Sequence, residues 1–302
     1  MSDIAAAPAT PIQADQIRAD QIRADPIPAD QIPADQIPAD PDPAAPIPAD
    51  PTSADPIAAP VPAASVPAAP VPAEPFLVSA PGVYRPQSDT GVLAGAIIGR
   101  AAARGRDVLD LGTGTGAAAL AAAGSGARSV TAVDLSRRAV GVARLNARLH
   151  RVRLHRARLH PARVRVHHGD LFAPVRGRRF GLITANPPYV PSATDRLARH
   201  RSSRSWDGGR DGRLLVDRIC DGAAEHLVPG GLLLLVHGGA CGADRTLERL
   251  AGHGLTARVV ERVRIPLGPV MRARAALHEA RGLAEPGAVD EELVVIEASR
   301  AC

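Results

Sequence analysis

Two apolar patterns alternate along the chain from residue 76 to residue 302. Candidate strands, several of them apolar runs typical of buried strands, occupy 106–112, 129–135, 164–170, 180–188, 231–237, 255–265 and 292–298. Alanine-rich or amphipathic stretches predict helices over 92–103, 115–123, 136–149, 211–226 and 242–252, the first with Ser88, Asp89 and Thr90 as N-cap side chains. Such strands, separated by helices, indicate a sheet covered on both faces. We therefore predict an α/β fold with a seven-stranded, mostly parallel, doubly wound sheet.

Residues 1–75 follow a different pattern. They contain 18 of the 29 prolines of the chain, and from residue 11 they repeat five-residue units such as PIQAD and QIRAD. Each unit has a single isoleucine or valine, which is too little apolar surface to offset the entropy of ordering the chain. We predict a disordered spacer over 1–75, with a partner-binding arm as the alternative, and one folded domain over 76–302.

Charge divides at the same boundary. The tail has eleven acids against Arg18 and Arg23, whereas the whole chain has a net charge of +5. The folded part is therefore strongly basic, and all of its basic side chains other than histidine are arginines. A domain of this charge attracts polyanions such as nucleic acid or the ribosome.

The cysteines and the length of the apolar runs indicate which cellular compartment to expect. Cys220, Cys241 and Cys302 lack C-x-x-C or zinc-ligand spacing, so we expect reduced thiols and no metal site. The N-terminus has no signal-peptide pattern, and the longest aliphatic run, Leu232–Val236, is far shorter than a membrane span. We expect a cytoplasmic protein without a membrane segment.

A glycine-rich loop follows the first predicted strand. Asp110 is followed at alternate positions by Gly112, Gly114 and Gly116, just before a predicted helix. Such glycines allow a tight turn and let a ligand approach bare backbone at a helix N-terminus. The spacing G-x-G-x-G differs from the dinucleotide fingerprint G-x-G-x-x-G. Because ligands of doubly wound folds bind at the carboxyl ends of the strands, we expect the site here.

Two further acids end the second and third predicted strands. Asp134 is placed to accept hydrogen bonds from both hydroxyls of a ribose. Asp170 is placed to accept from an exocyclic adenine amine, with Leu171 and Phe172 beside the ring. Each aspartate alone could equally be a helix cap, but three acids at successive strand ends favour a nucleoside-containing ligand.

The run Asn186, Pro187, Pro188 and Tyr189 ends the fourth predicted strand. The nitrogen of an amide or aromatic amine is a poor nucleophile because its lone pair is conjugated. The Asn186 side-chain carbonyl and the Pro187 backbone carbonyl can each accept one N–H, while the prolines fix the backbone in advance. Tyr189 can lie against the planar group. This run therefore favours transfer of a group to a planar nitrogen.

With these motifs the sequence resembles the HemK/PrmC family of protein-glutamine methyltransferases, which have a Rossmann-like class I fold. VYRPQSDT at 83–90 and SWDGGRDGR at 205–213 are similar to the shorter, eukaryotic-type branch. The resemblance implies S-adenosylmethionine as cofactor and a glutamine of a translation release factor or ribosomal protein as acceptor. It also implies that Tyr84, Pro86 and Thr90 cover the cofactor, in addition to the loop glycines, the three aspartates and Asn186.

Other functions stay open at this stage. A methyltransferase for adenine N6 or guanine N2 would need the same planar-amine clamp, and a basic binding module with a vestigial site is a third class. Residues 144–168 are rich in arginine, which indicates either a solvated extension or an element that contacts RNA or the ribosome. His150, His155 and His160 recur every five residues and so do not share a helix face, which argues against a metal site. The sequence does not identify an activating partner.

Overall fold

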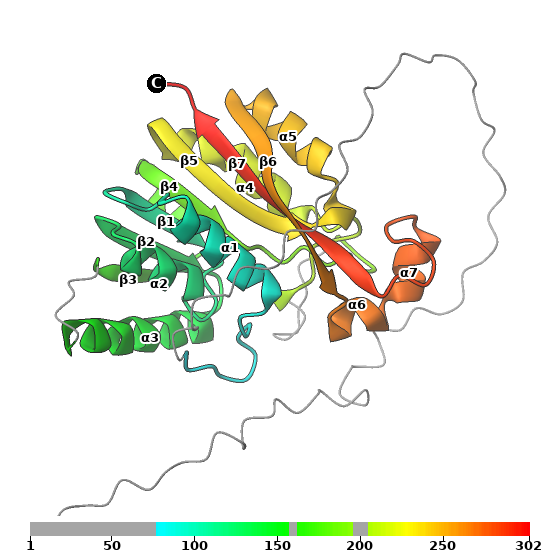
Figure 1. Cartoon of the computed structure of the whole chain (residues 1–302), viewed down its shortest axis with the longest axis horizontal. Helices are drawn as coiled ribbons and strands as arrows, with labels where there is room; N and C mark the ends of the chain where they lie inside the picture. The colour runs from blue at the N-terminus through cyan, green and yellow to red at the C-terminus, as the bar shows by residue number, and fades with distance from the viewer. Residues whose placement is uncertain (1–76, 157–161, 196–204) are drawn as a thin grey trace, which may run out of the picture. The chain divides into compact units, whose positions relative to one another are not determined.

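The structure is a computed structural model that describes residues 77–156, 162–195 and 205–302 (Figure 1). The predicted spacer at 1–75 lies outside the described residues, as do residues 157–161 of the arginine-rich segment. None of the helices in the described ranges has the length and apolar character needed to cross a membrane.

Seven strands form one sheet in the order β3-β2-β1-β4-β5-β7-β6. The strands are β1 (Asp107–Leu111), β2 (Ser129–Asp134), β3 (Val164–His168), β4 (Phe180–Ala185), β5 (Leu227–Gly238), β6 (Leu255–Pro266) and β7 (Asp290–Arg300). The pairs from β3 to β5 are parallel, and β7 runs antiparallel to both β5 and β6. The predicted seven-stranded, mostly parallel sheet is confirmed.

Helices cover both faces of this sheet. They are α1 (Ser88–Gly99), α2 (Ala117–Gly124), α3 (Arg137–Arg156), α4 (Leu214–His226), α5 (Ala243–Gly252), α6 (Pro269–Ala273) and α7 (Ala275–Ala280), with single 3-10 turns at Ala173–Val175 and Gly239–Cys241. The first three pack on one face, and α4 and α5 pack on the other (Figure 1). The doubly wound arrangement is therefore confirmed.

Adjacent residues of the central strands point to opposite faces. In β1, Leu109 and Leu111 join the core beneath α4 and α5, whereas Val108 joins the core beneath α1 and α2. In β4, Ile183 joins the core beneath α4 and α5, and Leu182 joins the core beneath α1 and α2. Both faces of these strands are thus apolar, which is why the sequence reads as uninterrupted apolar runs.

Three predictions about helices need correction. The first helix spans 88–99 and not 92–103; its N-cap residue is Gln87, and Asp89 and Thr90 lie buried within its first turn. The third helix continues to Arg156, seven residues beyond the predicted end, because the arginine-rich stretch keeps an apolar residue at helical spacing. The pair α6–α7, between β6 and β7, was not predicted at all.

Candidate functional site

The glycine loop, residues 110–116, lies at the carboxyl end of β1. Its three glycines have positive φ angles, +67° at Gly112, +55° at Gly114 and +92° at Gly116, a region that other residues rarely adopt. The N–H groups of Gly112 and Thr113 both donate to the carbonyl of Val133 at the end of β2, at 2.9 and 3.1 Å. The loop is thus folded back over the sheet edge.

Asp110 supports this loop from below. Its carboxylate accepts hydrogen bonds from the hydroxyls of Thr113 at 2.6 Å and Thr184 at 2.7 Å, and the residue is 2% exposed. Burial raises the pKa of Asp110 to about 6, although the two hydroxyl hydrogen bonds oppose this shift. Asp110 therefore fixes the loop and β4 relative to each other, and does not itself face solvent.

Asp134, at the end of β2, holds the loop from the side. One carboxylate oxygen accepts the N–H of Gly114 at 2.9 Å, and the other accepts the N–H of Ser136 at 2.7 Å. Desolvation raises the pKa of the carboxyl group above its usual value. The next residue, Leu135, keeps an apolar side chain 44% exposed. An oriented acid and an exposed apolar surface therefore stand together at this strand end.

Asp170, the acid that follows β3, already has a charged partner within the protein. The Asp170 carboxylate is paired with the Arg218 guanidinium of α4 at 2.6 Å, so an amine ligand would have to share it. Leu171 adopts a positive φ of 42°, which is rare for a residue with a side chain. Phe172 stacks on His226 with ring centroids 4.4 Å apart, so one face of its ring is taken by the protein and not free to flank a ligand.

The Asn-Pro-Pro-Tyr run lies beside the glycine loop. Strand β4 pairs with β1 so that Ala185 aligns with Leu111, and the next residues, Asn186 and Gly112, are therefore neighbours. A methyl group added to Gly112 would lie 3.9 Å from the Asn186 carbonyl oxygen. The Asn186 side-chain nitrogen lies 3.4 Å from the Thr90 hydroxyl, to which it donates, and no described residue donates to its Oδ1. Pro187 is buried, and Pro188 is half-buried.

A buried carboxylate, Asp89, joins the segment before α1 to this run. Asp89 is 5% exposed and accepts the Tyr84 hydroxyl at 2.7 and 2.8 Å, the Tyr189 hydroxyl at 3.3 Å and the Thr90 N–H at 2.6 Å. Burial, with Asp89 as the nearest charge, raises the pKa of both tyrosines above their usual value. Pro86, in the same segment, is half-buried. Tyr84, Thr90 and Tyr189 thus converge on Asp89, which lies in the 83–90 motif but was not among the predicted site residues.

A second acid, Glu291 of β7, approaches the same cluster. A methyl group on Gly238 would meet the Tyr189 ring at 3.1 Å and the Glu291 carboxylate at 3.3 Å, so these two side chains converge there. Burial and the charge of Asp89 raise the pKa of Glu291 to about 7. Glu291 comes from the last strand, and its sequence context gave no signal for a place near the site.

The loop at 205–213 clamps the backbone after Tyr189. Val190 accepts the N–H of Gly208 at 2.8 Å and donates its own N–H to the carbonyl of Trp206 at 2.9 Å. A Cβ on Gly208 would lie only 2.7 Å from the Tyr189 Cα. Nothing larger than glycine fits, which explains the glycines of this loop.

Two buried arginines fasten the clamp. Arg213, 2% exposed, donates to the Cys241 carbonyl at 2.6 Å and to the Asp217 carboxylate at 2.6 Å. Arg274, between α6 and α7, pairs with Asp207 at 2.7 Å and donates to the Pro191 carbonyl at 3.1 Å. The unpredicted helices therefore position the segment that leaves the Asn-Pro-Pro-Tyr run.

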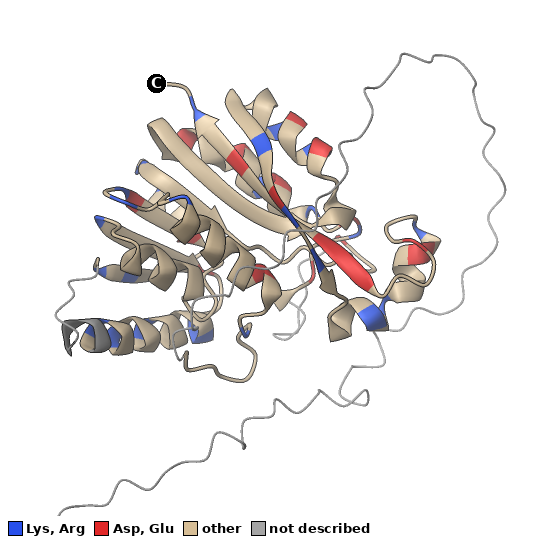
Figure 2. Ribbon diagram, viewed as in Figure 1, with Lys and Arg blue, Asp and Glu red and all other residues tan. Residues whose placement is uncertain are grey.

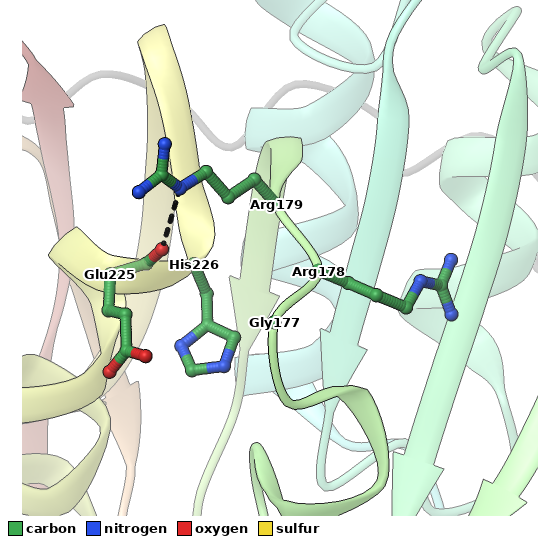
Figure 3. A pocket seen from close by; sticks show the side chains of 5 residues that line it. All are labelled: Gly177, Arg178, Arg179, Glu225 and His226. Carbon is green, nitrogen blue, oxygen red and sulfur yellow. Dashed lines mark hydrogen bonds between the residues drawn. The ribbon is translucent and has the colours of Figure 1, made fainter.

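One cavity, of about 320 Å³, lies elsewhere (Figure 3). It is lined by Gly177, Arg178, Arg179, Glu225 and His226. Arg179 donates to the Glu225 carbonyl at 3.3 Å. These residues precede β4 or end α4, so the cavity lies at the amino end of β4, opposite to the glycine loop and Asn186.

Comparison with known proteins agrees with this geometry. Residues 77–201 match the family model "Methyltransferase small domain". A protein described as a putative protein N5-glutamine methyltransferase of Methanocaldococcus jannaschii is 30% identical over 191 residues, which is 63% of this chain and 90% of that protein. A release factor glutamine methyltransferase of Moorella thermoacetica is 38% identical over 57% of this chain and 60% of its own length.

Among solved structures, the Mtq2-Trm112 complex of E. cuniculi has a chain that is 23% identical, with a TM-score of 0.49 over 73% of this chain and 99% of that chain. A similarity of this size adds nothing on substrate. The archaeal relative is matched over nearly its whole length, whereas the release factor enzyme is matched over less than two thirds of its length. The chain belongs to the protein N5-glutamine methyltransferase family, whose members are S-adenosylmethionine-dependent enzymes of the Rossmann-like class I fold.

Proposed function

We propose that the chain methylates the side-chain amide nitrogen of a glutamine in a protein substrate. The observation that carries the proposal is the position of Asn186: it borders the glycine loop, its amide nitrogen is taken by Thr90, and its Oδ1 faces no donor among the described residues. The orientation of the Asn186 amide therefore suits a ligand that brings an N–H group.

The residues at the strand ends fit S-adenosylmethionine. The glycine loop leaves bare backbone, Asp134 keeps lone pairs for ribose hydroxyls beyond the two N–H groups it accepts, and Leu135 offers apolar surface for a base. Tyr84 stands beside the loop, since a methyl group on Gly114 would lie 3.8 Å from its carbonyl oxygen, and Pro86 and Thr90 belong to the same segment. When bound, the cofactor supplies an electrophilic methyl group on a sulfonium.

The protein's own residues prepare the acceptor. Asn186 Oδ1 and the Pro187 carbonyl each accept one N–H of the amide, which holds the amide plane so that the nitrogen lone pair faces the methyl group to be transferred. Tyr189, with its hydroxyl held by Asp89, offers a ring against the planar group. The proton leaves to solvent during or after transfer, so no strong general base is required.

The acceptor protein follows from the relatives and stays a proposal for this chain. The bacterial relative is named for its action on release factors. A translation factor is therefore the first substrate to test, with a ribosomal protein next. A subunit that assists substrate docking would be identified by affinity purification of this chain together with its methylated substrate.

A nucleic-acid amino methyltransferase is the second candidate because one observation favours it: α3 exposes arginines along one side and contains no acid. Adenine N6 and guanine N2 are planar amines that the same carbonyl pair would accept. A base in a duplex must first be flipped out, and the described residues contain no separate domain for that step.

The test incubates the protein with a cell lysate and S-adenosylmethionine that has a labelled methyl group. One half of the product is then treated with protease and the other half with nuclease. We expect label that protease removes and nuclease leaves, and N5-methylglutamine in the digested protein. The Asn186→Ala variant is the matched control, because it lacks only the accepting amide. Label that disappears with nuclease alone would select the second candidate.

A further inference from the structure

The exposed side of α3 combines charge with apolar surface. One face of α3 is formed by residues at positions i, i+3, i+4 and i+7, which are Leu145, Arg148, Leu149 and Val152. Arg137 lies at the edge of this face, near the start of the helix. Leu145 is 44% exposed, Leu149 37% and Val152 51%. These five residues are the α3 face. Three of the exposed large apolar side chains in the described residues therefore lie on a single helix.

The arginines of the α3 face differ from those of the opposite sheet edge. Along β6, Arg258, Arg262 and Arg264 each pair with an acid of β7, at 2.6 to 2.8 Å. The α3 sequence has no acid, and neither Arg137 nor Arg148 forms an ion pair with a described residue. Figure 2 shows blue bands along α3 without red. The α3 face thus has uncompensated positive charge next to apolar side chains.

The N-terminal tail enters the fold at this helix. The backbone N–H and carbonyl of Val78 both bond to the Asn146 side chain, at 2.9 Å each. Asn146 is 2% exposed and also donates to the Thr115 carbonyl at 2.9 Å, so the anchor is firm. Arg138 donates to the Pro81 carbonyl at 3.2 Å. Residues before Val78 therefore start beside the middle of α3.

The part of the tail next to the fold has the complementary composition. Residues 41–75 contain Asp42, Asp50, Asp55 and Glu74, isoleucines and valines at intervals, and no basic side chain. A chain of this length reaches on the order of 100 Å when extended, and α3 is roughly 30 Å long. A tether this short gives an effective concentration on the order of millimolar, so that even weak contacts are populated.

We propose that residues 41–75 of the same chain dock on the α3 face, with their acids toward Arg137 and Arg148 and their isoleucines and valines against Leu145, Leu149 and Val152. The tail then shields the basic helix from polyanions in the cell. This inference is independent of the methyl acceptor, because none of these residues belongs to the site at the strand ends.

The experiment uses the full chain with a nitroxide label on Ser53→Cys in a Cys302→Ser background, since Cys220 and Cys241 are buried. We expect the amide resonances of α3 near Leu145–Val152 to broaden. The broadening should be relieved at about 0.5 M salt, where charges are strongly screened. It should also be relieved in the tail variant Asp42→Asn, Asp50→Asn, Asp55→Asn, Glu74→Gln.

A matched pair of double variants locates the effect. Arg137→Gln with Arg148→Gln should relieve the broadening, whereas Arg258→Gln with Arg264→Gln removes the same charge from β6 and should leave it. Broadening that is absent from α3, or that survives neutralisation of the tail, would overturn the proposal.

Two further outcomes identify other occupants. Broadening of α3 in an unlabelled chain mixed with the labelled one would assign the face to the tail of a second copy and overturn docking in cis. Binding of poly(U) should be severalfold tighter in the tail variant than in the wild type. Equal binding to both would mean that the tail does not shield the basic surface from nucleic acid, and would overturn the proposal.

Discussion

Two glycine-rich segments border the Asn-Pro-Pro-Tyr run, and their glycines serve opposite purposes. In the glycine loop, a methyl group on Gly112 or Gly114 would meet no heavy atom closer than 3.8 Å. In the 205–213 loop, a methyl group on Gly208 would lie 2.7 Å from both the Tyr189 Cα and the Gly212 carbonyl oxygen. The first segment is open next to its glycines, and the second is filled.

The two loops need glycine for different reasons, one for its backbone conformation and the other for its lack of a side chain. The φ angles of Gly112 and Gly114 are positive, so these positions need glycine for backbone shape while the space above them stays free for a ligand. Gly208 needs to be glycine because the Tyr189 backbone occupies the space of a side chain. Under the proposed function, the first loop is the one that receives the cofactor, and the second fixes the residues proposed to receive the acceptor.

The largest expected effect is that of Asn186→Ala, at the point where the two regions meet. We expect kcat to fall by about 10³-fold, the order found when one oriented polar group of a transition-state site is removed. Binding of S-adenosylhomocysteine, measured by calorimetry, should stay within a few-fold of wild type, because the Asn186 backbone carbonyl that borders Gly112 is unchanged in the variant. Equal losses in turnover and cofactor affinity would contradict the assigned role.

The second prediction concerns the filled loop. Gly208→Ala should destabilise the fold by about 3 kcal/mol, because the new methyl group overlaps backbone atoms that cannot move independently. Urea denaturation measures the free energy of unfolding. Gly141→Ala is a matched control, since Gly141 lies in α3 with nothing within 4 Å, and it should not destabilise. A mild effect at Gly208 would mean that the clamp is looser than its geometry implies.

The third prediction concerns the open loop. Gly114→Ala should cost only about 1 kcal/mol of stability, from the strain of a positive φ without a steric overlap. Its main effect should be on the ligand: we expect cofactor affinity to fall about tenfold while kcat at saturation changes little. Calorimetry and initial rates distinguish these quantities. If Gly114→Ala destabilises as strongly as Gly208→Ala, the contrast between the two loops is wrong.

Much of this site was predictable from the sequence because of the parallel sheet. Carboxyl ends of neighbouring parallel strands meet at one edge, so residues that follow such strands converge. Asp110, Asp134 and Asn186 are of this kind, and the structure brings the first two to the glycine loop and the third beside it. Apolar runs likewise gave the central strands β1, β4 and β5, since burial on both faces leaves little polar alternation. The edge strands β3 and β6 contain arginines and are partly exposed.

The residues that sequence reasoning missed depend on tertiary contacts. Asp89 looked like part of a helix cap, because Ser-Asp-Thr before an apolar stretch is a capping pattern; its carboxylate instead receives two tyrosine hydroxyls, one of them 100 residues away. Glu291 reaches the cluster because β7 inserts between β5 and β6, a pairing that no local pattern encodes. The start of α6 did have a signal, since Gly268 and Pro269 form a helix N-terminus with Pro in the first turn.

The smallest expected effect compares two acids through the pH dependence of stability: Asp110 beneath the glycine loop and Glu291 beside Tyr189. The pKa of Glu291, near Tyr189, is raised from 4.5 to about 7, and that of Asp110, beneath the glycine loop, is raised from 3.8 to about 6. A raised carboxyl pKa means that the folded state binds more protons than the unfolded state between the two values. The stabilisation is therefore complete at low pH and is lost as pH rises through the folded-state pKa.

Glu291→Gln isolates one of these contributions. Buried His237, whose pKa is lowered to about 4, changes stability in the opposite direction over part of the same range, so the difference between variant and wild type is the quantity to measure. Because glutamine does not titrate, the variant should gain stability relative to wild type as pH rises from 4.5 to about 7, and the difference should then stay constant. Asp110→Asn should lack this simple gain, because Asp110 also accepts two hydroxyl hydrogen bonds that fix the glycine loop. A difference for Glu291→Gln that does not change with pH would mean that Glu291 is solvated, and that the acceptor side of the site is less closed than the packing of Tyr189 against Gly238 implies.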